Sequence, residues 1–125
     1  MDIQKLAGFN RIYQAGCFRD EVRAMFGKNV GEMNRYLKWL NIWLTVLDNE
    51  GMNALTLEQF EHLKGTENPN LYAIRHPHSK INERYIYLYS DNESTVLLTA
   101  FKEKSKQDYK FAITRAENIA ASLER

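Results

Sequence analysis

The residue types and the spacing of apolar residues change at residues 65–70, and this change constrains the fold more than any other feature. Before Gly65, apolar residues recur at helical spacing, whereas the residues after Asn70 are rich in aromatic and β-branched types. The segment 66–70 between the two parts contains Thr, Asn and Pro and is typical of a turn. The pattern predicts a helical first half followed by a sheet, which is an α+β arrangement.

The first half of the chain predicts two main helices. One begins at Phe18 and ends at Gly27, and a longer one spans about residues 30–47 with apolar side chains on more than one side. We expect a short strand within residues 8–15, before these helices.

A third, shorter helix is predicted before the change in character. Residues 48–53 are polar and indicate a loop. Thr56 is followed three residues later by Gln59, which is the spacing of a capping box. We therefore expect a helix that starts at this pair and continues through Leu63.

The second half predicts three strands and a closing helix. The strands span residues 71–76, 84–89 and 95–101, and their short links favour antiparallel neighbours in a small sheet, with a mixed sheet as the alternative. Residues 105–123 carry apolar side chains along one stripe and predict a helix that packs on this sheet.

Length and composition predict one domain over residues 1–125. The chain has 125 residues, of which 44% are hydrophobic, enough for one ordinary core and too few for two. The 17 basic and 16 acidic residues give a formal net charge of +1, so the overall charge does not indicate nucleic acid binding. Cys17 is the single cysteine, which suits a reducing compartment, and we interpret it as a small core residue.

The sequence predicts a cytoplasmic protein without a membrane segment. Residues 1–6 lack the basic segment and long apolar run of a secretory signal. The most apolar stretch, residues 39–47, is far shorter than the ~20 residues that cross a bilayer. Trp39 and Trp43 within it are interpreted as core or partner-interface residues.

Three stretches of the second half, taken in order, carry a resemblance to a known family. They are Phe60-Glu61-His62-Leu63-Lys64-Gly65 with Leu71-Tyr72-Ala73-Ile74-Arg75, then Glu83-Arg84-Tyr85-Ile86-Tyr87-Leu88-Tyr89, then Val96-Leu97-Leu98-Thr99-Ala100-Phe101-Lys102-Glu103-Lys104. In order and spacing they resemble the RelE/HigB toxins of type II toxin–antitoxin systems, over roughly residues 55–120. Two positions depart from the family's pattern: Ala73, where Glu is frequent, and Glu103, in a turn that is usually more basic.

The resemblance implies a RelE-like fold and a ribosome-dependent endoribonuclease that cleaves mRNA by acid–base chemistry without a metal or cofactor. It also implies a partner, a helix-turn-helix antitoxin of the HigA kind. The alternative is a non-catalytic interaction protein that keeps this fold. Departures from the family's pattern at Ala73 and Glu103, and the near-zero net charge, favour the alternative.

Cleavage of RNA without a metal requires a base for the 2′-hydroxyl, cations for the phosphate and an acid for the leaving oxygen. Arg75 and Arg84, on neighbouring predicted strands, are interpreted as phosphate-binding residues, with pairing to surface carboxylates as the alternative. Lys102 and Lys104 follow the third strand at the same end of the sheet. They are further candidates for phosphate contacts.

Three other residues are candidates for proton transfer. The resemblance places Asp108 and Tyr109, in the first turn of the last helix, among the active-site residues, although Tyr109 also fits the apolar stripe of that helix. His76 is an acid–base candidate, and the sequence His76-Pro77-His78 also invites a metal interpretation. Two histidines without a nearby acidic or cysteine ligand are weak evidence for zinc, so we predict no metal site.

Three tyrosines alternate along the second predicted strand. Tyr85, Tyr87 and Tyr89 share one face, which suits either a platform for stacking bases or a sheet face covered by helices. We interpret them as core residues.

Overall fold

A computed structural model describes residues 2–123 as an α+β fold with one six-stranded mixed sheet. Its elements in chain order are β1 (Ile3–Lys5), β2 (Ile12–Ala15), α1 (Phe18–Phe26), α2 (Val30–Glu50), the 3-10 helix η1 (Gly51–Thr56), β3 (Phe60–His62), β4 (Leu71–Arg75), β5 (Glu83–Tyr89), β6 (Thr95–Lys102) and α3 (Lys106–Leu123). Among these residues, no helix is long and apolar enough to cross a bilayer.

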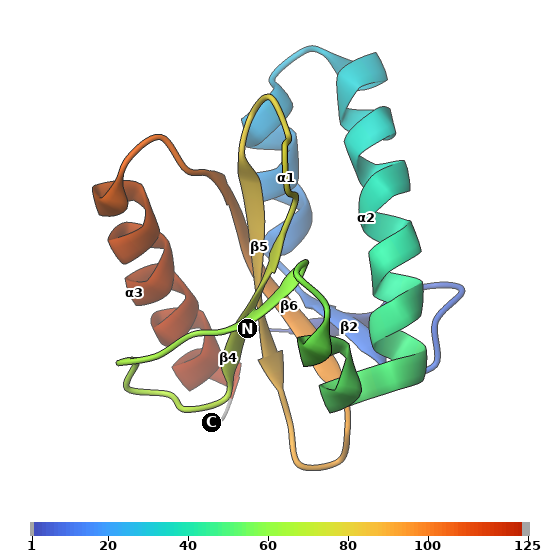
Figure 1. Cartoon of the computed structure of the whole chain (residues 1–125), viewed down its shortest axis with the longest axis vertical. Helices are drawn as coiled ribbons and strands as arrows, with labels where there is room; N and C mark the ends of the chain where they lie inside the picture. The colour runs from blue at the N-terminus through green and yellow to red at the C-terminus, as the bar shows by residue number, and fades with distance from the viewer. Residues whose placement is uncertain (1, 124–125) are drawn as a thin grey trace.

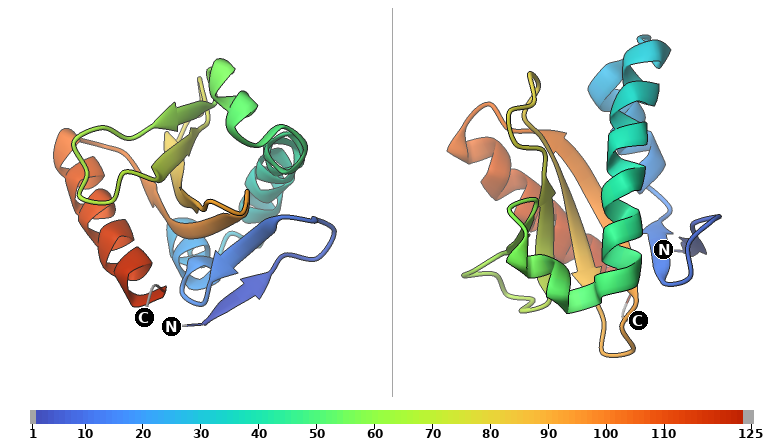
Figure 2. Two further views of the ribbon diagram at one scale, coloured as in Figure 1. Left: turned by 90° about the horizontal axis from the view of Figure 1, so that it is seen from below. Right: turned by 45° about the vertical axis from the view of Figure 1, so that its right-hand side comes forward.

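The sheet is covered by helices on both faces. Its strands lie in the order β1-β2-β6-β5-β4-β3, and all neighbours are antiparallel except β2 and β6, which are parallel. Figure 1 shows α3 on one face and α1 with α2 on the other, and Figure 2 shows the same layers from two further directions. The predicted antiparallel order of β4, β5 and β6 is confirmed.

Each face of the sheet has its own hydrophobic core, because successive strand residues point to opposite faces. Along β4, Tyr72 and Ile74 pack towards α1 and α2, whereas Leu71 and Ala73 pack towards α3. Tyr85 and Tyr87 are almost fully buried on the α1/α2 side, as predicted for core residues. Tyr89 is partly buried against the same core.

A β-bulge interrupts the pairing of β5 with β6. Tyr87 lies opposite Leu97, but the preceding residue Ile86 lies opposite Thr99, so Leu98 is an extra residue on β6. An extra residue reverses which face the following side chains point to. Phe101 therefore lies opposite Arg84, and Lys102 lies on the other face.

The N-terminal part contributes two strands and not only helices. β1 and β2 form a hairpin at the sheet edge, so the single short strand expected within residues 8–15 is in fact the second strand of a pair. The carboxylate of Asp48, near the end of α2, accepts hydrogen bonds from the backbone N–H groups of Asn10 (2.9 Å) and Arg11 (2.7 Å). These bonds fix the hairpin loop to α2.

The prediction of a polar loop over residues 48–53 and of a helix through Leu63 is wrong. α2 continues to Glu50, and η1 occupies the rest of the expected loop. The Thr56 hydroxyl donates to the carbonyl of Asn53 (3.0 Å) and caps no helix. Phe60 lies opposite Ile74 in the sheet and is buried, so burial of this aromatic side chain overrides the local capping signal.

Gly27 and Gly51, which end α1 and α2, allow a matched test of this packing. Their φ angles are +56° and +55°, where an L side chain is strained, but a Cβ would meet no atom within 4 Å at Gly27 and the Tyr89 hydroxyl at 2.6 Å at Gly51. We expect Gly27→Ala to cost about 1–3 kcal/mol of unfolding free energy through strain alone. Gly51→Ala should cost about 1–3 kcal/mol more through overpacking.

Urea unfolding of the two variants measures this difference. Tyr89→Phe, which removes the clashing hydroxyl, should bring the cost of Gly51→Ala down to that of Gly27→Ala. Equal costs for the two glycine variants in the parent protein would contradict the packing described for Tyr89.

Candidate functional site

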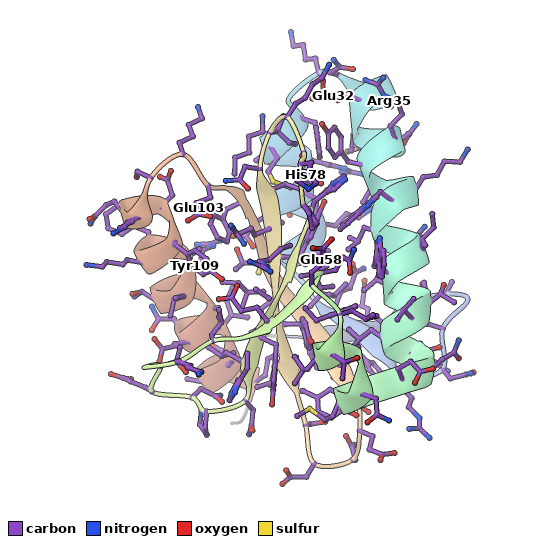
Figure 3. All side chains as sticks on the ribbon, in the orientation of Figure 1. Glu32, Arg35, Glu58, His78, Glu103 and Tyr109 are labelled. Carbon is purple, nitrogen blue, oxygen red and sulfur yellow. The ribbon has the colours of Figure 1, made fainter. Side chains whose placement is uncertain are left out.

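Arg75 and Arg84 meet on the sheet face that α3 covers. Arg75, the last residue of β4, and Arg84, near the start of β5, are direct cross-strand partners, whereas the sequence predicted only that they lie on neighbouring strands. The guanidinium carbon of Arg84 lies 5.3 Å from the ring centroid of Tyr109 on α3. Figure 3 shows Tyr109 and Glu103 on this side of the sheet. We call Glu61, Arg75, Arg84, Glu103 and Tyr109 the Arg84 cluster.

The Arg84 side chain is largely buried, and not all of its N–H groups have an acceptor among the described residues. Its Nε donates to the carboxylate of Glu103, and the two side chains are only 16% and 18% exposed. Its Nη1 is buried and has no hydrogen-bond partner among residues 2–123. Leaving a buried donor unsatisfied costs about 1–3 kcal/mol, so such a donor requires an explanation.

Arg75 is the more exposed of the two arginines. Its Nε and Nη2 donate to the backbone carbonyl of Glu58 at 3.2 and 2.7 Å, and the carboxylate of Glu61 lies 3.7 Å from its Nε. Glu61 belongs to β3 and is the cross-strand partner of Ala73, where the family resemblance leads one to expect Glu. Sequence reasoning missed Glu61 because it assigned these residues to a helix.

Tyr109 presents a buried hydroxyl to the Arg84 cluster. The ring packs edge-on against Phe101 with centroids 5.5 Å apart, and the hydroxyl has no hydrogen-bond partner among the described residues. Burial, followed by the charge of Glu61, raises the pKa of Tyr109 to about 12, although Arg84 opposes the shift. Tyr109 is therefore protonated at neutral pH and has a hydrogen to donate to a ligand.

Three further predicted site residues do not belong to the Arg84 cluster: Lys102, Lys104 and Asp108. Lys102 lies on the opposite face of the sheet, with its ammonium 5.9 Å from the centroid of Phe26. Asp108 caps α3: its carboxylate accepts from the backbone N–H groups of Lys104 (2.8 Å) and Ser105 (3.0 Å). The Lys104 side chain is exposed on this turn.

His76 also lies on the α1/α2 face, away from Arg84. Its Nδ1 is 2.6 Å from the carboxylate of Glu83, which is fully buried and also accepts from the Ser79 hydroxyl. The imidazole stacks on Trp39 with ring centroids 3.7 Å apart. Burial, followed by the charge of Glu83, raises the pKa of Tyr85 well above its usual range. The structure thus separates His76 and Lys102 from the two arginines.

No group of three or more His, Cys, Asp and Glu side chains within residues 2–123 is placed to hold a metal ion. The sequence matches no protein-family model, and no curated protein matches it significantly. A functional assignment for this chain therefore depends on the geometry of the Arg84 cluster and on the motifs of the sequence.

Proposed function

We propose that this protein is a RelE/HigB-like endoribonuclease that cleaves mRNA on the ribosome, with the Arg84 cluster as its phosphate-binding centre. The observation that carries this proposal is that the Arg84 guanidinium lies over the Tyr109 ring beside the second arginine, Arg75, while Arg84 Nη1 and the Tyr109 hydroxyl are both buried and unpartnered within residues 2–123. An incoming phosphate that displaces the groups covering these donors can satisfy them. The order of helical pair, antiparallel strands and closing helix supports a RelE-like fold.

In this proposal, Arg84 provides the main electrostatic stabilisation of the phosphate during cleavage. A guanidinium binds a phosphate through two parallel hydrogen bonds and stabilises the charge that grows on it during cleavage. Glu103 occupies part of this fork in the free protein, so a substrate phosphate takes over the position of the Glu103 carboxylate. Arg75, directly across the strand pair, provides a second cation for the RNA backbone.

In this proposal, Tyr109 is the general acid and Glu61 is the general base. With a pKa near 12, Tyr109 carries its proton at neutral pH and donates it, or a hydrogen bond, towards the leaving oxygen. A carboxylate must then draw the proton from the 2′-hydroxyl, because His76 lies on the other face of the sheet. Glu61 is 39% exposed and beside Arg75, which makes it accessible for this role.

The second candidate function is a non-catalytic interaction protein that keeps the same fold. It is favoured by the internal pairing of the arginines, since Arg84 is held by Glu103, and Arg75 by Glu58 and Glu61. In both cases the proposed partner is a helix-turn-helix antitoxin. Growth arrest on induced expression, with cuts in a reporter mRNA, supports the nuclease; binding to the antitoxin without either effect supports the alternative.

Arg84→Lys should reduce mRNA cleavage about 100-fold or more. The substitution keeps a cation for Glu103 but removes the planar fork that stabilises the phosphate. Primer extension on a reporter mRNA with translating ribosomes measures the cuts. Arg115→Lys is the matched control, because Arg115 pairs with Glu21 outside the cluster. Equal loss in both variants, or no loss in either, would remove Arg84 from the mechanism.

Tyr109→Phe should lower cleavage sharply while leaving the thermal unfolding midpoint near that of the parent. The change removes one hydroxyl and keeps the ring against Phe101. Tyr85→Phe provides the control, since the Tyr85 hydroxyl is also buried but lies on the α1/α2 face. Full cleavage by the Tyr109 variant would show that the hydroxyl takes no part.

Cleavage should survive removal of transition metals. Protein treated with EDTA and then dialysed into zinc-free buffer can be assayed with the magnesium that ribosomes need. We expect unchanged cutting, because the proposed chemistry uses only side chains. Loss of activity that returns on addition of zinc would refute a metal-independent mechanism.

A further inference from the structure

A hollow lies on the face of the sheet opposite the Arg84 cluster. It has a volume of about 610 Å³ and lies between the first turns of α2 and the loop that joins β4 to β5. Figure 3 shows Glu32 and Arg35 on α2 and His78 in the facing loop at this end of the molecule. Its lining residues, which define what we call the α2–loop hollow, are Glu32, Arg35, Tyr36, His76, His78, Ser79, Lys80 and Ile81.

The His76 side chain contacts three other side chains at the wall of the α2–loop hollow. Its Nδ1 bonds the buried carboxylate of Glu83, its ring stacks on Trp39, and Tyr36 contacts it edge-on with centroids 5.7 Å apart. Among the described residues, Nε2 has no hydrogen-bond partner, so it is the ring atom left for a ligand. A carboxylate on one imidazole nitrogen fixes the tautomer and orientation with which the other meets a ligand.

Two cations line the same hollow without internal counter-ions. Within residues 2–123, neither Arg35 nor Lys80 has a carboxylate within ion-pair distance, unlike Arg75 and Arg84. Glu32 is the one acidic residue in the lining. In the facing loop, His78 has a φ of +65°, in the left-handed region. The lining of the hollow therefore carries two cationic side chains, Arg35 from α2 and Lys80 from the loop, against one carboxylate.

We propose that the α2–loop hollow binds a terminal phosphate group, with Arg35 and Lys80 as its cationic contacts and Nε2 of His76 as its third. Such a group carries close to two negative charges and three acceptor oxygens, which matches two cations and one imidazole. His76 suits either protonation state of the ligand, because neutral Nε2 accepts a hydrogen bond from a monoanion and protonated Nε2 donates one to a dianion. The hollow is larger than one phosphate, and the Tyr36 ring forms a wall for an attached organic part.

NMR of the histidine ring resonances, with inorganic phosphate as the probe, tests this site in the whole protein. We expect the His76 resonances to shift and saturate with phosphate, while those of His62 stay in place. His62 serves as an internal control because its Nε2 is occupied by the Pro69 carbonyl at 2.8 Å and its ring stacks on Tyr72. Sodium chloride at equal ionic strength should leave both histidines unchanged. No saturable shift of His76, or equal shifts of both histidines, would overturn the proposal.

Surface variants locate the bound phosphate. Arg35→Ala and Lys80→Ala should each weaken phosphate binding about tenfold, the loss of one charge-assisted hydrogen bond. Lys38→Ala, on the same helix but outside the lining, should leave the affinity unchanged. Equal weakening by all three variants would indicate general charge attraction and contradict a specific site. The experiment needs no nuclease activity, so its outcome is independent of the function proposed for the Arg84 cluster.

Discussion

Strand β5 is buried on both faces of the sheet, and the alternation of its side chains decides where the polar groups of the molecule lie. Arg84 points to the α3 side, whereas Glu83 and Tyr85 point to the α1/α2 side. A charge removed from water costs several kcal/mol unless a partner satisfies it. Each buried charge therefore has a partner on its own face, Glu103 for Arg84 and His76 for Glu83. Strand β5 thus separates the Arg84 cluster from the Glu83–His76 pair, although Glu83 and Arg84 are adjacent in sequence.

Much of the fold could be predicted from the sequence, because the strands β4 to β6 and the helix α3 have strong local patterns. The placement of Arg75 and Arg84 on neighbouring strands followed from the same patterns, since short links favour antiparallel neighbours, but their direct pairing did not. The strand β3 could not be predicted, because it is short and its capping-box signal was stronger than its β-pattern. Its Phe60 becomes a strand residue only through burial against Ile74, a contact that local propensity does not reveal.

The candidate site was less predictable than the fold, because side-chain position depends on register. The bulge at Leu98 places Lys102 on the face opposite Arg84, and without it Lys102 would lie on the same face. Similarly, His76 follows Arg75 directly and so points the other way. The roles of Glu61 and Glu103 come from contacts between segments far apart in the chain, which a single sequence does not encode in any short pattern.

The parallel pairing of β2 with β6 has a consequence for the order in which the protein is assembled. β6 lies between β2 and β5, so Ile12 finds its partner Thr95 only after most of the chain has been synthesised. Contacts between residues far apart in sequence form late in folding, because the entropy cost of closing the long intervening segment comes before the stabilisation from the contact. The Arg84 cluster also requires Tyr109 from the last helix. A nascent chain consequently lacks the complete cluster while its helix α3 is still inside the ribosome.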